Sequence, residues 1–316
     1  MASFQARRKF LSGTAVLAAA VLSPRQAAFG QPAGKRTRLV LLGTGGGPRV
    51  VAPGRAKPAN LILINGVPYV VDCGEGVAHQ LVRSGVALNT LRHLFITHHH
   101  SDHNLDYGNL VYDGWVAGLR TPVDAYGPPP IRAMTEAYWQ LNRFDIETRI
   151  ADEGRPDLRK LLTAHEFSEP GLVMQNADVK VTAARVRHPP IEHAYAYRFD
   201  SADRSIVISG DTAYSPELVA LARGTDVLVH EAMHLGGLEN LLKRVPNAAT
   251  LREHLLASHS VTEDIGRTAA AAGVKLLVLS HLVPSDDDSL TDATWAEGVR
   301  KHYSGPIVVG RDLLEL

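Results

Sequence analysis

The stretch Thr97-His98-His99-His100-Ser101-Asp102-His103 directly follows an apolar segment, residues 91–97, that we expect to be a β-strand. Its side chains should therefore lie on a loop at a sheet edge, where binding sites are usually built. The donors it offers within six positions come from His98, His100, Asp102 and His103. Imidazole and carboxylate together suit zinc, and less specifically manganese or iron. One open catalytic metal needs three protein ligands and a water, so four ligands this close together indicate two ions. The alternative, a surface histidine cluster without a metal, is disfavoured.

Outward from this stretch, the chain is rich in expected strands that end at polar groups. The Asn65-Gly66 pair predicts a tight hairpin turn, because both residues tolerate a positive φ. The hydrophobic pattern predicts strands over residues 38–42, 60–64, 67–71, 91–97, 179–186, 195–199, 205–209, 225–229, 276–280 and 307–309. Helices are expected over residues 76–84, 131–142, 216–223 and 262–272, the last capped by Thr262 and ended by Gly273. This mixture predicts an α/β fold.

Composition excludes several other classes of protein. The 316 residues are 45% hydrophobic and 21% charged, which is ordinary for a globular protein. The 33 basic and 33 acidic residues balance, so no overall positive field attracts nucleic acid. A single cysteine, Cys73, excludes an internal disulfide and a cysteine-rich zinc module, and we expect it to be a small core residue.

The first thirty residues have the pattern of an export signal. Arg7 and Arg8 precede an apolar stretch of about a dozen residues, against the ~20 that a membrane-spanning helix needs. The paired arginines resemble a twin-arginine signal, so we expect residues 1–30 to be cleaved and residues 31–316 to form one periplasmic bacterial domain with no stable membrane insertion. An amphipathic N-terminal helix is the alternative. Because the segment carries four basic residues and no acidic ones, the mature chain would hold 29 basic and 33 acidic residues.

Six motifs in one order give the chain a resemblance to the metallo-β-lactamase superfamily, and within it to the ribonuclease Z and arylsulfatase-like branch. The central one is the family signature His-x-His-x-Asp-His at residues 98–103. The others are Asp72-Cys73-Gly74-Glu75-Gly76, Ser209-Gly210-Asp211-Thr212, Val229-His230-Glu231-Ala232, Ser258-His259-Ser260-Val261 and Leu279-Ser280-His281. The resemblance implies a four-layer αββα sandwich with two metal ions, expected to be zinc, in a groove at one edge of the two sheets.

The resemblance also implies which residues hold each ion. The first ion would be held by His98, His100 and His188, the second by Asp102, His103 and His281, and Asp211 would bridge both. Two such ions would lower the pKa of a shared water enough to form hydroxide at neutral pH. His193 is a rival to His188, but His188 ends an expected strand and fits the family position better.

Proton transfer is assigned to a different part of the sequence. Asp102, His230 and Glu231 are the candidate catalytic residues, with His230 expected to protonate the departing alkoxide. Glu231 has an equal alternative role in orienting a ligand histidine, and His259 is left open between a similar role and capping of the next helix. The remaining histidines are expected to be solvated or hydrogen-bonded without a chemical role; they include His99, His165, His234, His254 and His302.

The expected substrate is a small ester. Members of the superfamily that process tRNA carry a long basic arm, and nothing like it stands out in residues 115–170. We therefore expect an exported dinuclear-zinc hydrolase of small phosphodiester or aryl sulfate esters, with nucleic acid an unlikely partner and homo-oligomerisation left open. The alternatives are a hydrolase that opens lactone or β-lactam rings, and a metal-binding protein without turnover.

Overall fold

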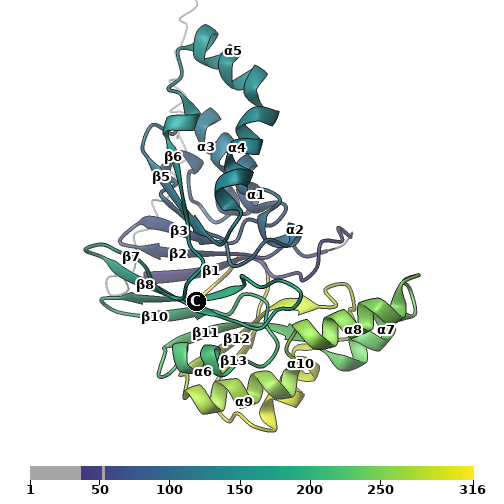
Figure 1. Ribbon diagram of the computed structural model, residues 1–316. Helices are drawn as coiled ribbons and strands as arrows, with labels where there is room; N and C mark the ends of the chain where they lie inside the picture. Colours follow the sequence, from purple (N-terminus) through teal and green to yellow (C-terminus); the bar gives the residue numbers. More distant parts are fainter. Residues whose placement is uncertain (1–36, 52–53) are drawn as a thin grey trace, which may run out of the picture. The chain divides into compact units, whose positions relative to one another are not determined.

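Two seven-stranded β-sheets pack face to face, with helices on both outer faces (Figure 1). The computed structural model describes residues 37–51 and 54–316, so the expected export signal lies outside the described residues. The four-layer αββα sandwich predicted from the sequence is thereby confirmed. Across the described ranges, no helix combines the length and hydropathy needed to cross a bilayer.

The first sheet carries the histidine-rich stretch at the end of one of its central strands. Its spatial order is β14 (Leu314–Glu315), β1 (Thr37–Gly43), β2 (Ala59–Ile64), β3 (Val67–Val71), β4 (His93–Phe95), β5 (Val123–Gly127) and β6 (Leu162–Glu166). The β2–β3 hairpin turns at Asn65 and Gly66, whose φ angles of 51° and 81° confirm the predicted turn. From β3 to β6 the neighbouring strands run parallel.

The second sheet has parallel strands on the side where the site is built. Its spatial order is β13 (Ile307–Val309), β12 (Leu276–Val283), β11 (Val227–Met233), β10 (Ser205–Ile208), β9 (Tyr195–Ser201), β8 (Val179–Arg185) and β7 (Gly171–Gln175). Strands β10 to β13 run parallel to one another, so their carboxyl ends meet at a single edge. β11 extends past the expected strand over residues 225–229 and carries His230 and Glu231 within it.

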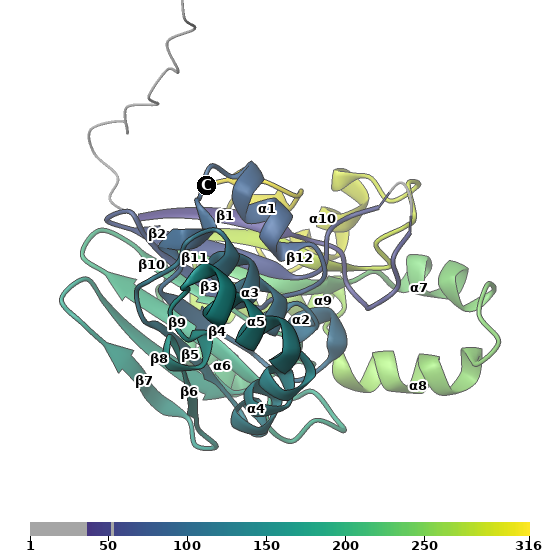
Figure 2. The same cartoon turned by 90° about the horizontal axis from the view of Figure 1, so that it is seen from above.

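Helices cover the two sheets in separate groups (Figure 1). Over the first sheet lie α1 (Val77–Arg83), α2 (Ser101–Asn104), α3 (Tyr107–Val116), α4 (Ile131–Leu141) and α5 (Arg143–Glu153), with the short 3₁₀ turns η1 (Leu88–Thr90) and η2 (Leu158–Lys160). Over the second lie α6 (Pro216–Leu221), α9 (Thr262–Ala272) and α10 (Asp292–Arg300). Helices α7 (Leu235–Leu242) and α8 (Ala248–Ser258) pack against each other as a hairpin to one side of the second sheet (Figure 2).

Three apolar layers hold this arrangement together. The layer between the sheets contains Leu39 and Phe95 from the first sheet and Tyr197 and Val229 from the second. Separate clusters fill the spaces between each sheet and its helices. Cys73 is fully buried in the cluster under the first group of helices, in agreement with its expected core role. Burial of these side chains is the main force that fixes the sheet edges relative to each other.

Candidate metal centre

The histidine-rich stretch lies opposite the ends of the second sheet's strands. His98 and His100 are on the loop after β4, and Asp102 and His103 are on α2. Strands β8, β10 and β12 of the second sheet run in the same direction, so their carboxyl ends lie at one edge and bring three more donors. These are His188 after β8, Asp211 after β10 and His281 near the end of β12. All seven residues of the expected ligand set therefore lie in one place, in the two groups expected from the sequence.

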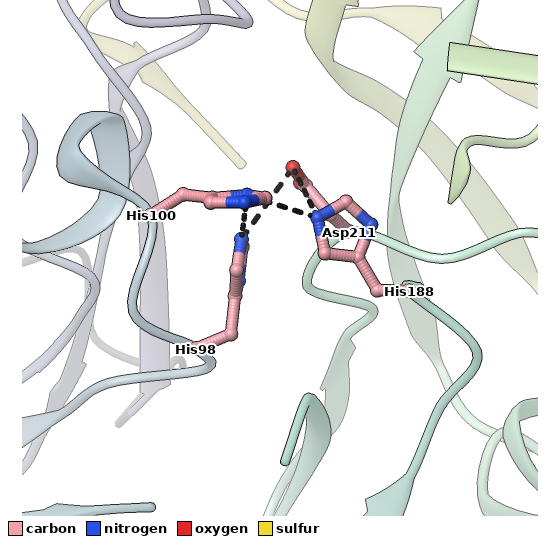
Figure 3. A group of neighbouring side chains, drawn as sticks. All are labelled: His98, His100, His188 and Asp211. Atoms are coloured by element: carbon pink, nitrogen blue, oxygen red, sulfur yellow. Dashed lines mark hydrogen bonds and ion pairs between the residues drawn. The ribbon is translucent and has the colours of Figure 1, made fainter. Parts of the chain in front are cut away.

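The first group consists of three imidazoles around one carboxylate (Figure 3). The Nδ1 atom of His100 lies 3.1 Å from Nε2 of His98 and 3.0 Å from Nε2 of His188. All three nitrogens point toward a common centre beside Asp211. His193, the rival to His188, lies outside this group with its Nδ1 3.4 Å from the hydroxyl of Tyr195.

Asp211 joins the first group to the second through one oxygen atom. Its Oδ2 lies 3.2 Å from Nε2 of both His103 and His281 in the second group. The same oxygen lies 3.8 Å from Nε2 of His98 and 3.9 Å from Nε2 of His188 in the first. A carboxylate shared in this way is the arrangement needed to bridge two cations, and it is 2% exposed.

Asp102 completes the second group from the side of the glycine-rich loop at residues 45–47. Its Oδ2 accepts a hydrogen bond from the backbone N–H of Gly47 at 2.9 Å and lies 3.4 Å from Nε2 of His281. A Cβ on Gly46 would lie 2.8 Å from the His281 ring and 2.6 Å from Cγ2 of Val283. Glycine is therefore required at residue 46 for the loop to approach His281 this closely.

Two further groups orient the ligand histidines from behind. Asp72 accepts hydrogen bonds from Nδ1 of His103 at 2.8 Å and from the backbone N–H of Thr97 at 2.8 Å. The carbonyl of Ser258 accepts a hydrogen bond from Nδ1 of His188 at 2.8 Å. Each bond fixes the proton on Nδ1 and leaves Nε2 free to face the centre, as metal-binding histidines require. The sequence motif around Asp72 signalled its importance but not this role.

Burial and charge divide the two groups electrostatically. Burial lowers the pKa of His98 and His100, and it lowers the pKa of His188 to about 4, so these imidazoles are neutral at pH 7. In the second group burial is again the largest single effect and acts in the same direction, but the surrounding carboxylates, Asp211 foremost, together outweigh it and raise the pKa of His103 and His281. The pKa of His281 reaches about 10. Without a metal, protons on the second group would balance the carboxylates.

The residues present fit a pair of divalent cations. Two atoms that face the centre, Nε2 of His103 and Oδ1 of Asp211, are buried without a hydrogen-bond partner among the described residues. Unpartnered buried polar atoms are costly unless something binds them. A set of imidazoles and carboxylates with no thiolate suits zinc, manganese or iron. His98, His100 and His188 would hold one ion, Asp102, His103 and His281 the other, and Asp211 both.

A histidine that the sequence left open lies beside the centre. His259 follows α8, and its Nδ1 lies 3.1 Å from Oε1 of Glu231 and 4.0 Å from Oδ2 of Asp211. The backbone N–H groups of Thr212 and Ser260 donate to the same Glu231 oxygen at 3.1 and 3.0 Å. Although burial opposes protonation, the Glu231 carboxylate raises the pKa of His259. This contact favours the protonated form of His259, which also lines the cavity over the centre.

His230 does not reach the centre, which contradicts the predicted role of this residue as proton donor. Neighbouring residues on a strand point to opposite faces, and on β11 Glu231 faces the centre while His230 faces the helices outside the sheet. Its neighbours on that face, Leu228 and Ala232, belong to the cluster under α6, α9 and α10. The His230 ring is fully buried, its Nδ1 donates to the carbonyl of Glu231 at 2.7 Å, and burial lowers its pKa. The predicted pairing of His230 with Glu231 is replaced by that of His259 with Glu231.

A cavity of about 360 Å³ opens over the centre. Its floor includes His100, Asp102 and His259, and one wall comes from the α7–α8 hairpin. His254 on α8 also lines it, with its ring centroid 6.1 Å from that of His100 and 6.2 Å from that of His259. His254 was expected to be solvated or hydrogen-bonded without a chemical role. Its place four residues before Ser258, on the same face of one helix, was the available signal.

Comparisons with known proteins agree with this architecture. The sequence profile described as the Beta-lactamase superfamily domain matches residues 68–282. Ribonuclease Z of Mycobacterium sp. (strain KMS) is 34% identical over 279 residues, which cover 87% of this chain and 94% of that protein. Among solved structures, the metallo-beta-lactamase fold protein YhfI from Bacillus subtilis has a TM-score of 0.64 at 19% identity and covers 89% of this chain and 98% of its own. Human tRNase Z, short form, has a TM-score of 0.63 at 19% identity, and the match covers 88% of this chain and 98% of that protein.

Proposed function

The chain belongs to the metallo-β-lactamase superfamily and is a hydrolase, and we propose that it cleaves phosphodiester bonds in small substrates with two bound divalent ions. Zinc is the ion that the donor set suits best. The observation that carries the proposal is the shared carboxylate: Oδ2 of Asp211 lies 3.2 Å from His103 and His281 and within 4 Å of His98 and His188. Beside it lies His259, whose imidazole is held by Glu231, and the carboxylate of Glu231 raises the pKa of that imidazole.

In the proposed hydrolysis, the bound ions and the protein's own residues would have separate roles. When bound, the two ions lower the pKa of a water and neutralise charge on the ester oxygens. Nε2 of His259 faces away from its Glu231 partner and would give its proton to the departing oxygen, because an alkoxide leaves poorly without one. Glu231 stabilises the protonated ring and holds its orientation through two backbone N–H groups. The backbone N–H of Gly47 holds the carboxylate of Asp102 in place.

The charges around the cavity support a small substrate rather than RNA. Among the described residues that line it, Arg49 is the only lysine or arginine. Its guanidinium lies 3.4 Å from the carboxylate of Asp286, which also pairs with Arg244 at 3.0 Å. Proteins that bind RNA or DNA neutralise several phosphates with free cations. The relatives named Ribonuclease Z favour phosphodiester chemistry, and the paired charges at this cavity favour a short substrate.

Export forms part of the proposal. Arg7 and Arg8 before an apolar stretch support transport by the twin-arginine route, followed by removal of residues 1–30. The mature hydrolase would then act in the periplasm, where a small ester diffusing across the outer membrane would meet it.

A panel of chromogenic substrates tests the proposed reaction. Purified mature protein, loaded with zinc and freed of excess metal, would be offered an aryl phosphodiester, an aryl sulfate, a lactone and a β-lactam. We expect the phosphodiester to be turned over fastest, and the Asp211→Ala variant to lose that activity. Faster hydrolysis of the lactone or β-lactam would replace the proposal with ring opening, and faster hydrolysis of the aryl sulfate would replace it with sulfatase activity.

A further inference from the structure

The wall of the cavity formed by α7 and α8 is apolar. Helix α8 presents Leu251, His254 and Leu255 to the cavity, spaced three and four residues apart on one face. Leu241 from α7 and Val245 from the connection between the helices extend the same surface. The opposite face of α8 is exposed and carries Arg252, Glu253 and Leu256.

The His254 ring connects this wall to the expected metal ligands. The His254 ring lies 6.1 Å from His100 and 6.2 Å from His188, measured between ring centroids. Leu251 and Leu255 flank His254 on the same helix face and line the cavity over the centre, so they face the space that a substituent of a bound phosphoester would occupy. The end of α8 is itself part of the site, because the carbonyl of Ser258 orients His188.

We propose that the α7–α8 hairpin binds an aromatic or alkyl substituent of the substrate, so that the enzyme acts on phosphodiesters that carry an apolar group next to the phosphate being attacked. This inference rests on the proposed function and names its substrate class. Leu241, Val245, Leu251 and Leu255 supply the contact surface, which removes the substituent from water. Arg49 is the only lysine or arginine among the described residues that line the cavity, and it is paired with Asp286, so this side of the cavity offers no cluster of cations for a second phosphate.

The kinetic test compares two substrates with the same leaving group. Bis(4-nitrophenyl) phosphate and methyl 4-nitrophenyl phosphate both release nitrophenolate and differ in the apolar size of the group that remains. We expect wild type to prefer the bis-aryl ester in kcat/KM, and Leu251→Ala to reduce that preference roughly tenfold, mainly through KM, as for a group lost from an apolar pocket. Leu256→Ala is the matched control, since Leu256 is on the same helix but 38% exposed and outside the cavity.

A binding test keeps the inference separate from the proposed function. Isothermal titration calorimetry of the zinc-loaded protein with phenylphosphonate and with methylphosphonate measures binding affinity and needs no turnover. We expect phenylphosphonate to bind more tightly in wild type and in Leu256→Ala, and this advantage to disappear in Leu251→Ala. If Leu251→Ala does not fold, Val245→Thr removes apolar surface with little change in volume and serves in its place. Equal binding of the two phosphonates by wild type would overturn the inference, whereas absent phosphodiesterase activity with intact phenyl preference would overturn only the proposed reaction.

Discussion

Nδ1 of His259 lies 3.1 Å from Oε1 of Glu231, and that oxygen also accepts two backbone hydrogen bonds. Glu231 thus holds the imidazole in one orientation and raises its pKa. The adjacent His230 faces the other side of β11 and bonds to a backbone carbonyl. Of these two histidines, only His259 lines the cavity. It can therefore exchange a proton with a bound substrate, whereas His230 cannot.

This difference predicts how the two histidines respond to substitution. His259→Ala should reduce hydrolysis of phosphodiesters with alkyl leaving groups by ~10²–10⁴-fold, the usual contribution of a general acid. It should reduce release of nitrophenolate much less, because nitrophenolate departs without a proton. Steady-state rates on the two substrate types, with bound metal quantified in each sample, give the comparison.

His230→Ala provides the contrast in the same assay. Removal of this fully buried ring should lower the melting temperature, because it leaves a cavity beside α9. Loss of activity, if any, should be equal for good and poor leaving groups. A selective loss on alkyl esters in His230→Ala, with none in His259→Ala, would restore the role predicted from the sequence.

Asp72 is expected to set metal affinity without contacting the metal. It accepts the Nδ1 proton of His103, so Asp72→Asn removes the charge that orients and polarises that ligand. Substitutions of such supporting groups typically weaken metal binding by about 10- to 100-fold. Competition with a chromophoric chelator would measure this. Asp106→Asn is the control, because Asp106 accepts from the backbone of Gly76 and contacts none of the seven ligands.

The two halves of the centre should respond differently to pH. The pKa of His281 is about 10, and that of His103 is also raised, so a metal ion entering the second group must displace protons. The pKa of His188 is about 4, and burial also lowers the pKa of His98 and His100, so an ion entering the first group has few protons to displace at neutral pH. Between pH 8 and pH 6, affinity for one ion should fall by about tenfold per pH unit for each proton displaced, while affinity for the other stays nearly constant. Stepwise zinc titrations at several pH values would contradict this if both affinities fell in parallel.

Export can be tested independently of catalysis. Changing both Arg7 and Arg8 to lysine should keep the precursor in the cytoplasm, because the twin-arginine route requires the arginine pair. Arg25→Lys alters a basic residue of the same segment outside the pair and should leave export unchanged. Immunoblots of periplasmic and cytoplasmic fractions measure the outcome. Undiminished periplasmic protein in the double variant would indicate another route.

Local sequence pattern predicted the four donors of residues 98–103, and the resemblance to the metallo-β-lactamase superfamily supplied the grouping of all seven ligands. Neither predicted the direction in which the side chains of β11 point. His98 to His103 form one short motif after a strand, and Asp211 and His281 belong to parallel strands that end at the same edge. The choice between His230 and His259 depends on the face of β11 that His230 occupies, on the bulge between Glu231 and Ala232, and on where the end of α8 places His259. None of these is encoded in residue type or spacing.

The α7–α8 hairpin was missed for a related reason. In α7, Leu238, Leu241 and Leu242 have helical spacing. In α8, apolar and charged residues alternate without a clear helical period, so the sequence does not show which face of the helix borders the cavity. Strands β5 and β6 were also missed, although the alternating burial of β5 had a visible apolar–polar pattern in its sequence. Short alternating segments give weak signals unless a neighbouring strand is known.

Metal content and phosphodiesterase activity, measured on the same samples, would show whether hydrolysis requires two ions. Mature protein would be stripped with a chelator, reloaded with zinc in steps, and assayed with bis(4-nitrophenyl) phosphate after elemental analysis at each step. We predict that activity rises to its maximum only as the content approaches two ions per chain, and that Asp211→Ala reaches neither that content nor that activity, since Asp211 contacts both ligand groups. Full activity with one ion per chain, or two tightly bound ions with no phosphodiester hydrolysis, would contradict the account.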